Sequence, residues 1–172
     1  MEYTHPEALV STEWLADNLN ADGVRIVDAS YFLPSDKRDA KTEYATKHIP
    51  GAVFFNIDDI CLDGSDLPHM LPDEETFSAK VGALGIGDGD KVVVYDPTGG
   101  GMAAARVWWM FRVFGANDIA LLNGSLPKWL AEGRPTTDEI PTPVPATFTA
   151  SKNDDLVRDI EQMLANVDSR AE

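Results

Sequence analysis

The stretch "KVVVYDPTGGGMAAARVWWMF", from Lys91 to Phe111, decides the fold of this chain. Residues 91–95 are β-branched and apolar on both faces, which is typical of a parallel strand buried in a sheet. Three glycines follow, and a helical pattern then runs from Met102 to Phe114, where Gly115 is suited to end it. The stretch therefore predicts a central strand, a tight loop and a helix whose N-terminus faces that loop.

Shorter versions of this unit surround it. Apolar runs predict further strands at residues 8–10, 24–29, 52–55 and 118–122. Between them, helices are expected after the N-capping residues Ser11 and Asp73, and again over residues 126–132. Strands that alternate with helices predict an α/β fold, in which helices cover both faces of a parallel sheet.

Composition limits what the protein can do. A length of 172 residues fits one domain with a short extension, and a net charge of −15 without a basic run excludes nucleic acid as a partner. No apolar run reaches the roughly 18 residues that span a membrane. The single cysteine, Cys61, allows no internal disulfide. The N-terminus has no signal-peptide pattern, so the cytoplasm is the expected compartment.

The end of the chain has a different character. Residues 134–150 contain four prolines and no helical period, which predicts an extended linker. The segment after it is amphipathic and carries an apolar stripe of Leu156, Ile160, Met163, Leu164 and Val167. We expect the chain to be the front portion of a longer protein; the alternative is a final helix that folds back onto the same domain.

The glycine loop is open to several interpretations. A P-loop is excluded because no Gly-Lys-Ser/Thr follows. Gly99, Gly101 and Ala104 match a dinucleotide fingerprint in form, but Asn123 stands where the next strand should end in an acidic residue. The residue that ends the strand is Asp96, which is either a catalytic carboxylate or a group that fills an anion site formed by the loop's own backbone N–H groups.

A family resemblance bears on this question. The segments "HIPGAVFFNID", "HMLPDEETF", "VVVYD", "ARVWWMFRVFG" and "LLNGSLPKWLAEGRP" resemble, in that order, the N-terminal domain of the tandem-domain rhodanese family. The resemblance implies a rhodanese-like α/β/α sandwich over residues 9–135, with a five-stranded parallel sheet in the order 1-5-4-2-3. It implies a proline-rich linker at 136–152 and, at 153–172, a helix that leads into a second rhodanese domain.

The family consists of thiosulfate and 3-mercaptopyruvate sulfurtransferases. In these enzymes a cysteine of the second domain carries a persulfide, while the first domain is a non-catalytic copy with aspartate at the equivalent point. The resemblance assigns that degenerate position to Asp96 and the anion loop to Gly99, Gly100 and Gly101. A carboxylate is a poor acceptor of sulfane sulfur, so we expect Asp96 to organise the loop and this chain alone to be inactive.

Two residues are implied as auxiliary catalytic groups. Asp58 and His69 match an Asp and a His that have been proposed, in 3-mercaptopyruvate sulfurtransferases, to reach the cleft between the domains. An Asp–His pair can orient an imidazole and hold its proton near neutral pH. His48 is expected to fix the turn before residues 52–55, and Cys61 is expected to be a thiol without a catalytic role.

The predicted function is therefore one part of a sulfurtransferase. The whole protein would move sulfane sulfur from 3-mercaptopyruvate or thiosulfate to a thiol or cyanide. Its partners would be a small anionic donor, a thiol acceptor and its own second domain, and neither a cofactor nor a metal is expected. The alternatives are an inactive rhodanese module that binds or regulates another protein, and a nucleotide-binding domain. Mitochondria are the alternative compartment, because the family occurs there too.

Overall fold

The computed structural model describes residues 4–99 and 101–170, and its centre is a sheet of five parallel strands. The strand order is β1-β5-β4-β2-β3, as the resemblance predicts. The strands are β1 (Leu9–Val10), β2 (Val24–Asp28), β3 (Val53–Phe54), β4 (Lys91–Tyr95) and β5 (Ile119–Leu122). β4 lies in the middle and pairs with β2 over five residues and with β5 over three.

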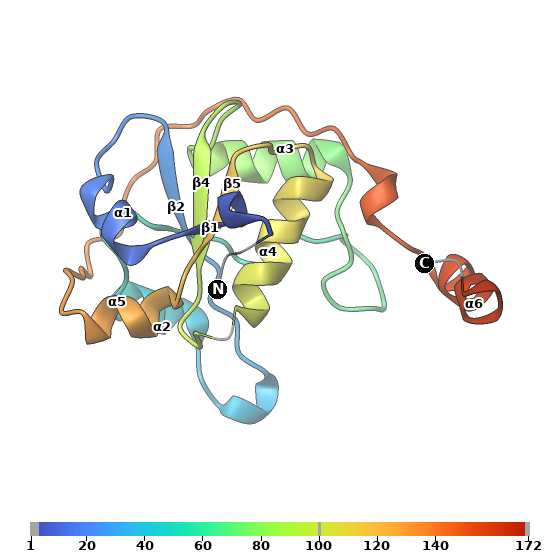
Figure 1. The fold of residues 1–172 in the computed structure, drawn as a ribbon, viewed down its shortest axis with the longest axis horizontal. Coiled ribbons are helices and arrows are strands. Elements are labelled where there is room, and N and C mark those ends of the chain that lie inside the picture. The colour runs from blue at the N-terminus through green and yellow to red at the C-terminus, as the bar shows by residue number, and fades with distance from the viewer. Residues whose placement is uncertain (1–3, 100, 171–172) are drawn as a thin grey trace.

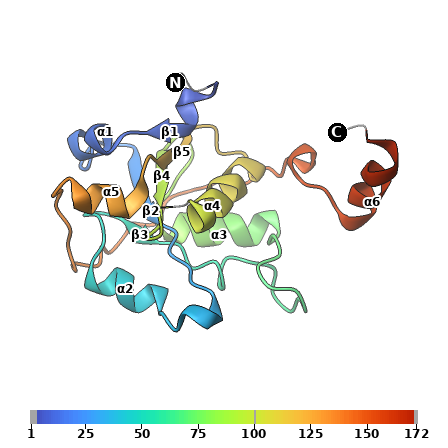
Figure 2. The same ribbon diagram turned by 60° about the horizontal axis from the view of Figure 1, so that its bottom comes forward.

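Helices form a layer on each side of this sheet, so the predicted α/β/α sandwich is confirmed (Figures 1 and 2). The α-helices are α1 (Thr12–Asp17), α2 (Ala40–Thr46), α3 (Glu74–Ala83), α4 (Met102–Val113), α5 (Ser125–Ala131) and α6 (Ile160–Ser169). Short 3₁₀ turns are η1 (Pro6–Ala8), η2 (Pro34–Asp36) and η3 (Asp154–Leu156). α2 was not predicted from the sequence, because Tyr44 is its only buried residue and the helix therefore has no apolar stripe.

β4 supplies apolar side chains to both layers. Val92 and Val94 pack with α3 and α4 on one face, and Val93 and Tyr95 pack with α1 and α5 on the other. This explains why residues 92–95 are all apolar instead of alternating with polar residues. The central position of β4 follows, because only a strand flanked by two others and covered on both faces can bury successive side chains in this way.

The predicted helix boundaries have identifiable caps. Ser11 Oγ accepts from the N–H of Trp14 at 3.0 Å, and Asp73 Oδ1 accepts from that of Thr76 at 2.7 Å. At the end of α4, Gly115 has φ 92° and the Ala116 N–H donates to the Phe111 carbonyl at 2.9 Å. This is a Schellman ending, which needs the positive φ that glycine tolerates.

The linker predicted at 136–152 packs along the domain. Residues 136–153, here called the strap, begin beside His48 and run along α3 to the C-terminal end of α4 (Figure 1). The Ala146 N–H donates to the Gly82 carbonyl and the Asn153 N–H donates to the Val113 carbonyl, at 2.9 and 2.7 Å. Phe148 is only 7% exposed and packs edge-on against the rings of Phe77 and Phe111. The strap is extended, as expected, and it completes the core on the α3–α4 side.

Beyond the strap, the final helix stands apart from the sheet (Figures 1 and 2). α6 begins at Ile160, because Asp159 and Gln162 form a capping box there. Its apolar stripe is open, since Ile160, Leu164 and Val167 are 71%, 60% and 69% exposed. Residues 171 and 172, which belong to the predicted final segment, lie outside the described residues.

Because the strap packs closely on α3, a glycine-to-alanine change at their contact should destabilise the protein instead of stabilising it. Replacing a helical glycine with alanine ordinarily stabilises a helix by up to about 1 kcal/mol. A Cβ on Gly82, however, would stand 2.5 Å from the Ala146 carbonyl oxygen. We therefore expect Gly82→Ala to lower the free energy of unfolding in urea by about 1–3 kcal/mol, as overpacking does. Ala79→Ser, on the exposed face of α3, should change it by less than about 0.5 kcal/mol. A more stable Gly82→Ala protein would show that the strap leaves α3 in solution.

Candidate functional site

Polar groups gather at the carboxyl edge of the sheet. Asp28 is the last residue of β2, Asp96 follows β4, and Ser125 begins α5 just after β5. All three are buried, with 1%, 0% and 4% of their surface exposed. Ligands of α/β proteins bind at this edge of a parallel sheet, so these residues form the candidate functional site.

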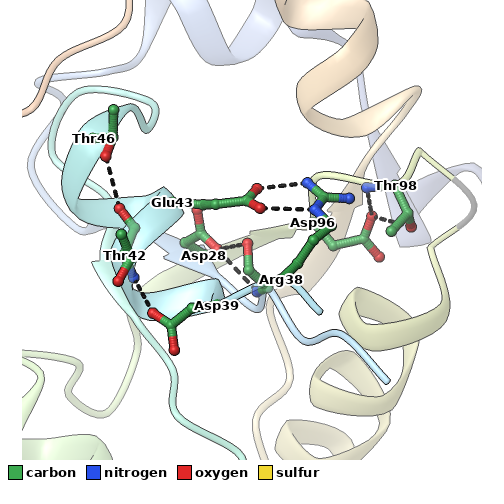
Figure 3. A network of polar contacts seen from close by, with 9 residues as sticks. Asp28, Arg38, Asp39, Thr42, Glu43, Thr46, Asp96 and Thr98 are labelled. Carbon is green, nitrogen blue, oxygen red and sulfur yellow. Dashed lines mark hydrogen bonds and ion pairs between the residues drawn. The ribbon is translucent and has the colours of Figure 1, made fainter. Parts of the chain in front are cut away.

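The Asp96 carboxylate is satisfied from within its own loop (Figure 3). Oδ1 accepts from the Thr98 N–H at 3.0 Å, from the Thr98 hydroxyl at 2.9 Å and from the Gly99 N–H at 3.1 Å. Oδ2 accepts from the N–H of Ala104, in the first turn of α4, at 3.2 Å. The expectation that this carboxylate takes the loop's N–H groups is confirmed, and Asp96 acts as a built-in anion.

The same geometry argues against a dinucleotide at the loop. A bound phosphate would need the backbone N–H groups at the start of α4, and the Ala104 N–H already donates to Asp96. Gly99 and Gly101 have φ of 71° and 68°, so both adopt the left-handed conformation that favours glycine. Gly100, the third residue assigned to the anion loop, lies outside the described residues.

Ser125 fixes the backbone of Asp96. Its hydroxyl accepts from the Asp96 N–H and donates to the Asp96 carbonyl, both at 2.7 Å. Ser125 has φ 54°, a conformation that a residue with a Cβ adopts at a cost. Glycine would adopt this φ more easily, and serine compensates with two buried hydrogen bonds to the Asp96 backbone.

Asp28 lies in a buried polar cluster beside the loop. It accepts from the Ser30 N–H at 2.9 Å and also from the Ser30 hydroxyl. Burial raises the pKa of the Asp28 carboxyl, although hydrogen bonds from Ser30 and Tyr95 and the charge of nearby His48 act in the opposite direction. The same burial, reinforced by Asp28, raises the pKa of Tyr95 well above its ordinary value.

His48 belongs to the scaffold, as the sequence predicts. It is fully buried, stacks on Tyr44 with ring centroids 4.2 Å apart, and contacts the Tyr44 carbonyl through Nδ1 at 2.7 Å. Its backbone pairs with Thr137 of the strap, and Nε2 lies 3.2 Å from the Glu139 carbonyl. Burial raises the pKa of Tyr44 to about 12, so its hydroxyl remains a neutral donor to the Ala52 carbonyl.

The structure brings together the two predicted auxiliary residues. His69 Nε2 lies 2.7 Å from Asp58 Oδ1, and the His69 ring packs edge-on against Tyr31 with centroids 4.9 Å apart. Because a carboxylate is only an acceptor, Nε2 is the donor in this pair. The Asp58 side chain is 67% exposed and that of His69 only 22%. The pair is thus accessible on the carboxylate side and sheltered on the imidazole side.

The backbone of His69 is held in an unusual state. Its φ is 56°, and a left-handed residue with a Cβ costs about 1–2 kcal/mol. An exposed ion pair contributes about 0.2–1 kcal/mol, so Asp58 alone does not hold His69 there. A further contact does: Arg106 Nη2 donates to the His69 carbonyl at 2.7 Å. The sequence gives no sign of this contact, because it joins residues 37 positions apart.

Cys61 lies in the same loop as Asp58 and His69. Partial burial and the neighbouring carboxylates of Asp58, Asp59 and Asp63 raise the pKa of its thiol. A persulfide carrier needs the opposite, a thiolate stabilised by N–H groups or cations. The Cys61 Sγ instead donates to the Asp58 carbonyl at 3.3 Å. The geometry therefore supports the view that this thiol has no catalytic role.

This parallel sheet, with a strand, an anion loop and a helix at its centre, defines a rhodanese-like domain. The family model named Rhodanese-like domain matches residues 11–132, and the chain belongs to this family. Thiosulfate sulfurtransferase of Bos taurus is 45% identical over 168 residues, which are 95% of this chain and 56% of that protein. Human 3-mercaptopyruvate sulfurtransferase is 40% identical over 168 residues, covering 95% and 57%.

A solved structure agrees with these relatives. The crystal structure of SseA from Escherichia coli, described as a 3-mercaptopyruvate sulfotransferase with the rhodanese fold, superposes with a TM-score of 0.89 and 32% identity. It is matched over 95% of this chain and 62% of SseA. The chain therefore spans little more than half the length of the two curated relatives named above.

The described residues offer neither a membrane-spanning helix nor a metal-binding cluster. No helix among residues 4–99 and 101–170 has the length and apolar character to cross a bilayer. The same residues hold no group of three or more His, Cys, Asp or Glu side chains placed to bind a metal ion.

The anion site occupied by Asp96 can be tested by emptying it. Asp96→Ala leaves the N–H groups of Thr98, Gly99 and Ala104 without their acceptor. Water can replace the acceptor at the exposed residues Thr98 and Gly99, whereas the buried N–H of Ala104 costs about 1–3 kcal/mol when it is left unsatisfied. We expect a loss of about 1–3 kcal/mol in the free energy of unfolding, partly and saturably restored by formate. Chloride at equal ionic strength and the wild-type protein with formate are the controls. An Asp96→Ala protein of unchanged stability that ignores formate would contradict the role of a built-in anion.

The raised pKa of Asp28 predicts a pH dependence. A carboxyl whose folded pKa lies above its unfolded value contributes stability that is present below the unfolded pKa, roughly 3.9, and is lost as the pH rises through the folded pKa. Asp28→Asn has no such loss. Its free energy of unfolding relative to wild type should therefore increase between pH 4 and pH 8 in urea titrations. Asp66→Asn, an exposed loop change, provides the comparison. A relative stability that falls with pH would mean that the carboxylate is favoured in the folded protein.

Proposed function

We propose that this chain is the N-terminal, non-catalytic part of a sulfurtransferase that uses a second rhodanese domain to carry the persulfide. The observation that carries the proposal is the buried Asp96 carboxylate, which occupies the loop where sulfur transfer requires a thiolate. Such a carboxylate is a poor acceptor of sulfane sulfur, and its acceptor sites are already filled by backbone N–H groups. The thiolate must then come from other polypeptide.

The relatives support the class of reaction. Proteins named thiosulfate sulfurtransferase and 3-mercaptopyruvate sulfurtransferase match almost the whole of this chain and extend well beyond it. We therefore propose thiosulfate or 3-mercaptopyruvate as the donor, and a thiol or cyanide as the acceptor. Both donors are small anions, and a chain with a net charge of −15 needs local cations to attract them. We expect most of those cations in the second domain.

The Asp58–His69 pair is proposed as this domain's contribution to the chemistry. The imidazole lies on a surface with exposed apolar side chains, among them Leu62, Leu67 and Met70, which suits contact with another domain. In this position His69 would hold or transfer a proton while the second domain's cysteine exchanges sulfur. Asp58 would orient the ring through Nε2.

The alternative is a rhodanese module that binds or regulates another protein. The exposed apolar stripe of α6 favours a protein partner of some kind, because Ile160, Leu164 and Val167 have no cover within the described residues. In the enzyme hypothesis the same stripe packs on the second domain. The two hypotheses therefore differ in whether the covering polypeptide carries a persulfide-forming cysteine.

A sulfurtransferase assay separates these hypotheses. The chain of 172 residues and the product of its complete gene are each supplied with thiosulfate and with 3-mercaptopyruvate, with cyanide or a thiol as acceptor. We expect turnover by the longer protein only, and Cys61→Ser should leave that turnover within about twofold of its original rate. Mass spectrometry then locates the persulfide. Its appearance on Cys61 of the 172-residue chain, or turnover by that chain alone, would defeat the proposal.

A further inference from the structure

Three contacts from different elements converge on His69. Asp58 holds the ring through Nε2 at 2.7 Å, Tyr31 lies edge-on to the ring, and Arg106 of α4 donates to the backbone carbonyl at 2.7 Å. Each contact restrains a different degree of freedom: the ring's rotation, the ring's plane and the local backbone. The imidazole of His69 is thus held by contacts to its ring and to its backbone, although the residue lies in a loop.

Arg106 is the most firmly placed of the three partners. It projects from α4, and its guanidinium lies 4.4 Å from the ring centroid of Trp109. No carboxylate lies within ion-pair distance of it in the part of the chain that the structure describes. Burial lowers the pKa of Arg106, but a guanidinium stays protonated in proteins. The half-buried cation therefore has the His69 carbonyl as its hydrogen-bond acceptor, and Trp109 keeps it aimed there.

The backbone of His69 needs such a restraint. Its left-handed φ of 56° is disfavoured for a residue with a Cβ, and the loop around it is largely exposed. Without Arg106 the residue would return to a commoner conformation, which would turn the side chain away from Asp58 and Tyr31. The contact with the exposed Asp58 carboxylate is too weak to hold the ring in this position by itself.

We propose that Arg106 is a positioning residue for His69, and that it makes Nδ1 the ring nitrogen that faces the chemistry. The proposal rests on the proposed function of His69. Since Asp58 fixes Nε2 as a donor, neutral His69 carries its lone pair on Nδ1. No hydrogen bond to Nδ1 exists among the described residues, so this atom is open to a proton from a reacting group. Arg106 never touches that group and acts through the His69 backbone.

The test on this chain is spectroscopic and independent of activity. Long-range ¹H–¹⁵N correlation spectra of the imidazoles report which nitrogen carries the proton. We expect His69 to be the Nε2–H tautomer in the wild-type protein and to become a mixture in Arg106→Gln. Arg112→Gln is the matched control, because Arg112 lies on the same helix and also stacks on a tryptophan, 4.9 Å from the ring of Trp108. Arg106→Lys keeps the cation and should fall between the two.

The outcomes decide the proposal in either direction. If the His69 signals of Arg106→Gln match those of wild type, Arg106 does not position the ring and the proposal is wrong. Should Arg106→Gln fail to fold, Arg106→Lys carries the same test, and unchanged His69 signals in that folded variant would equally overturn it. A tautomer mixture in Arg106→Gln with unchanged signals in Arg112→Gln supports it.

The full-length protein provides the kinetic test. We expect Arg106→Gln to lower kcat about tenfold, less than the hundredfold or more that removing a general base costs, with KM within about twofold. Arg112→Gln should leave both constants unchanged. If His69→Gln leaves kcat intact, the proposed function of His69 fails, while the spectra still report whether Arg106 positions it. The two hypotheses are therefore separable.

Discussion

The rest of the carboxyl edge depends on one interaction, the acceptance of backbone N–H groups by the buried Asp96 carboxylate. The residue ends the central strand, and its two oxygens join the loop to the first turn of α4. Ser125 then ties the Asp96 backbone to the start of α5. A loop built to hold an anion has become a closed structural unit, because the anion is part of the chain. The donors cannot serve a substrate and satisfy Asp96 together, which supports the proposal that this loop has a structural role.

That closure shifts attention to the residues around the loop. Asp28 and Tyr95 form a second buried polar layer in which burial raises both pKa values, and neither group is reachable from outside. The Asp58–His69 pair differs from them because it is partly open to solvent, with the Asp58 side chain 67% exposed and that of His69 22% exposed. Perturbed titration alone would have pointed to Asp28 as the functional residue. Asp28 is only 1% exposed, so a substrate cannot reach its carboxyl, and we interpret the group as structural.

Much of the fold could be read from the sequence, because the signals were local. Residues 92–95 of β4 are all apolar, Ser11 and Asp73 precede helices, and Gly115 follows the last turn of α4. The pairing of Asp58 with His69 came from family resemblance, which carries spacing information that a single chain lacks. The strap's contacts were not readable. An extended segment has no period, and Gly82 and Phe148 show their purpose only when α3 and the strap are placed side by side. The contact of Arg106 could not be predicted either, because its acceptor is the carbonyl of His69, 37 positions away in the sequence.

α4 unites these features mechanically. Its first turn donates to Asp96 through Ala104, its middle positions His69 through Arg106, and its far end receives the strap where Asn153 donates to Val113. Trp109 adds a second function at the middle, because its Nε1 donates to the Leu156 carbonyl at 3.0 Å while its ring supports Arg106. The segment that leads to α6 therefore leaves the domain beside α4, the helix whose Arg106 contacts His69. If a second domain follows α6, as proposed above, α4 would both position His69 and anchor the segment that leads to that domain, so this helix would help to set the geometry of a shared site.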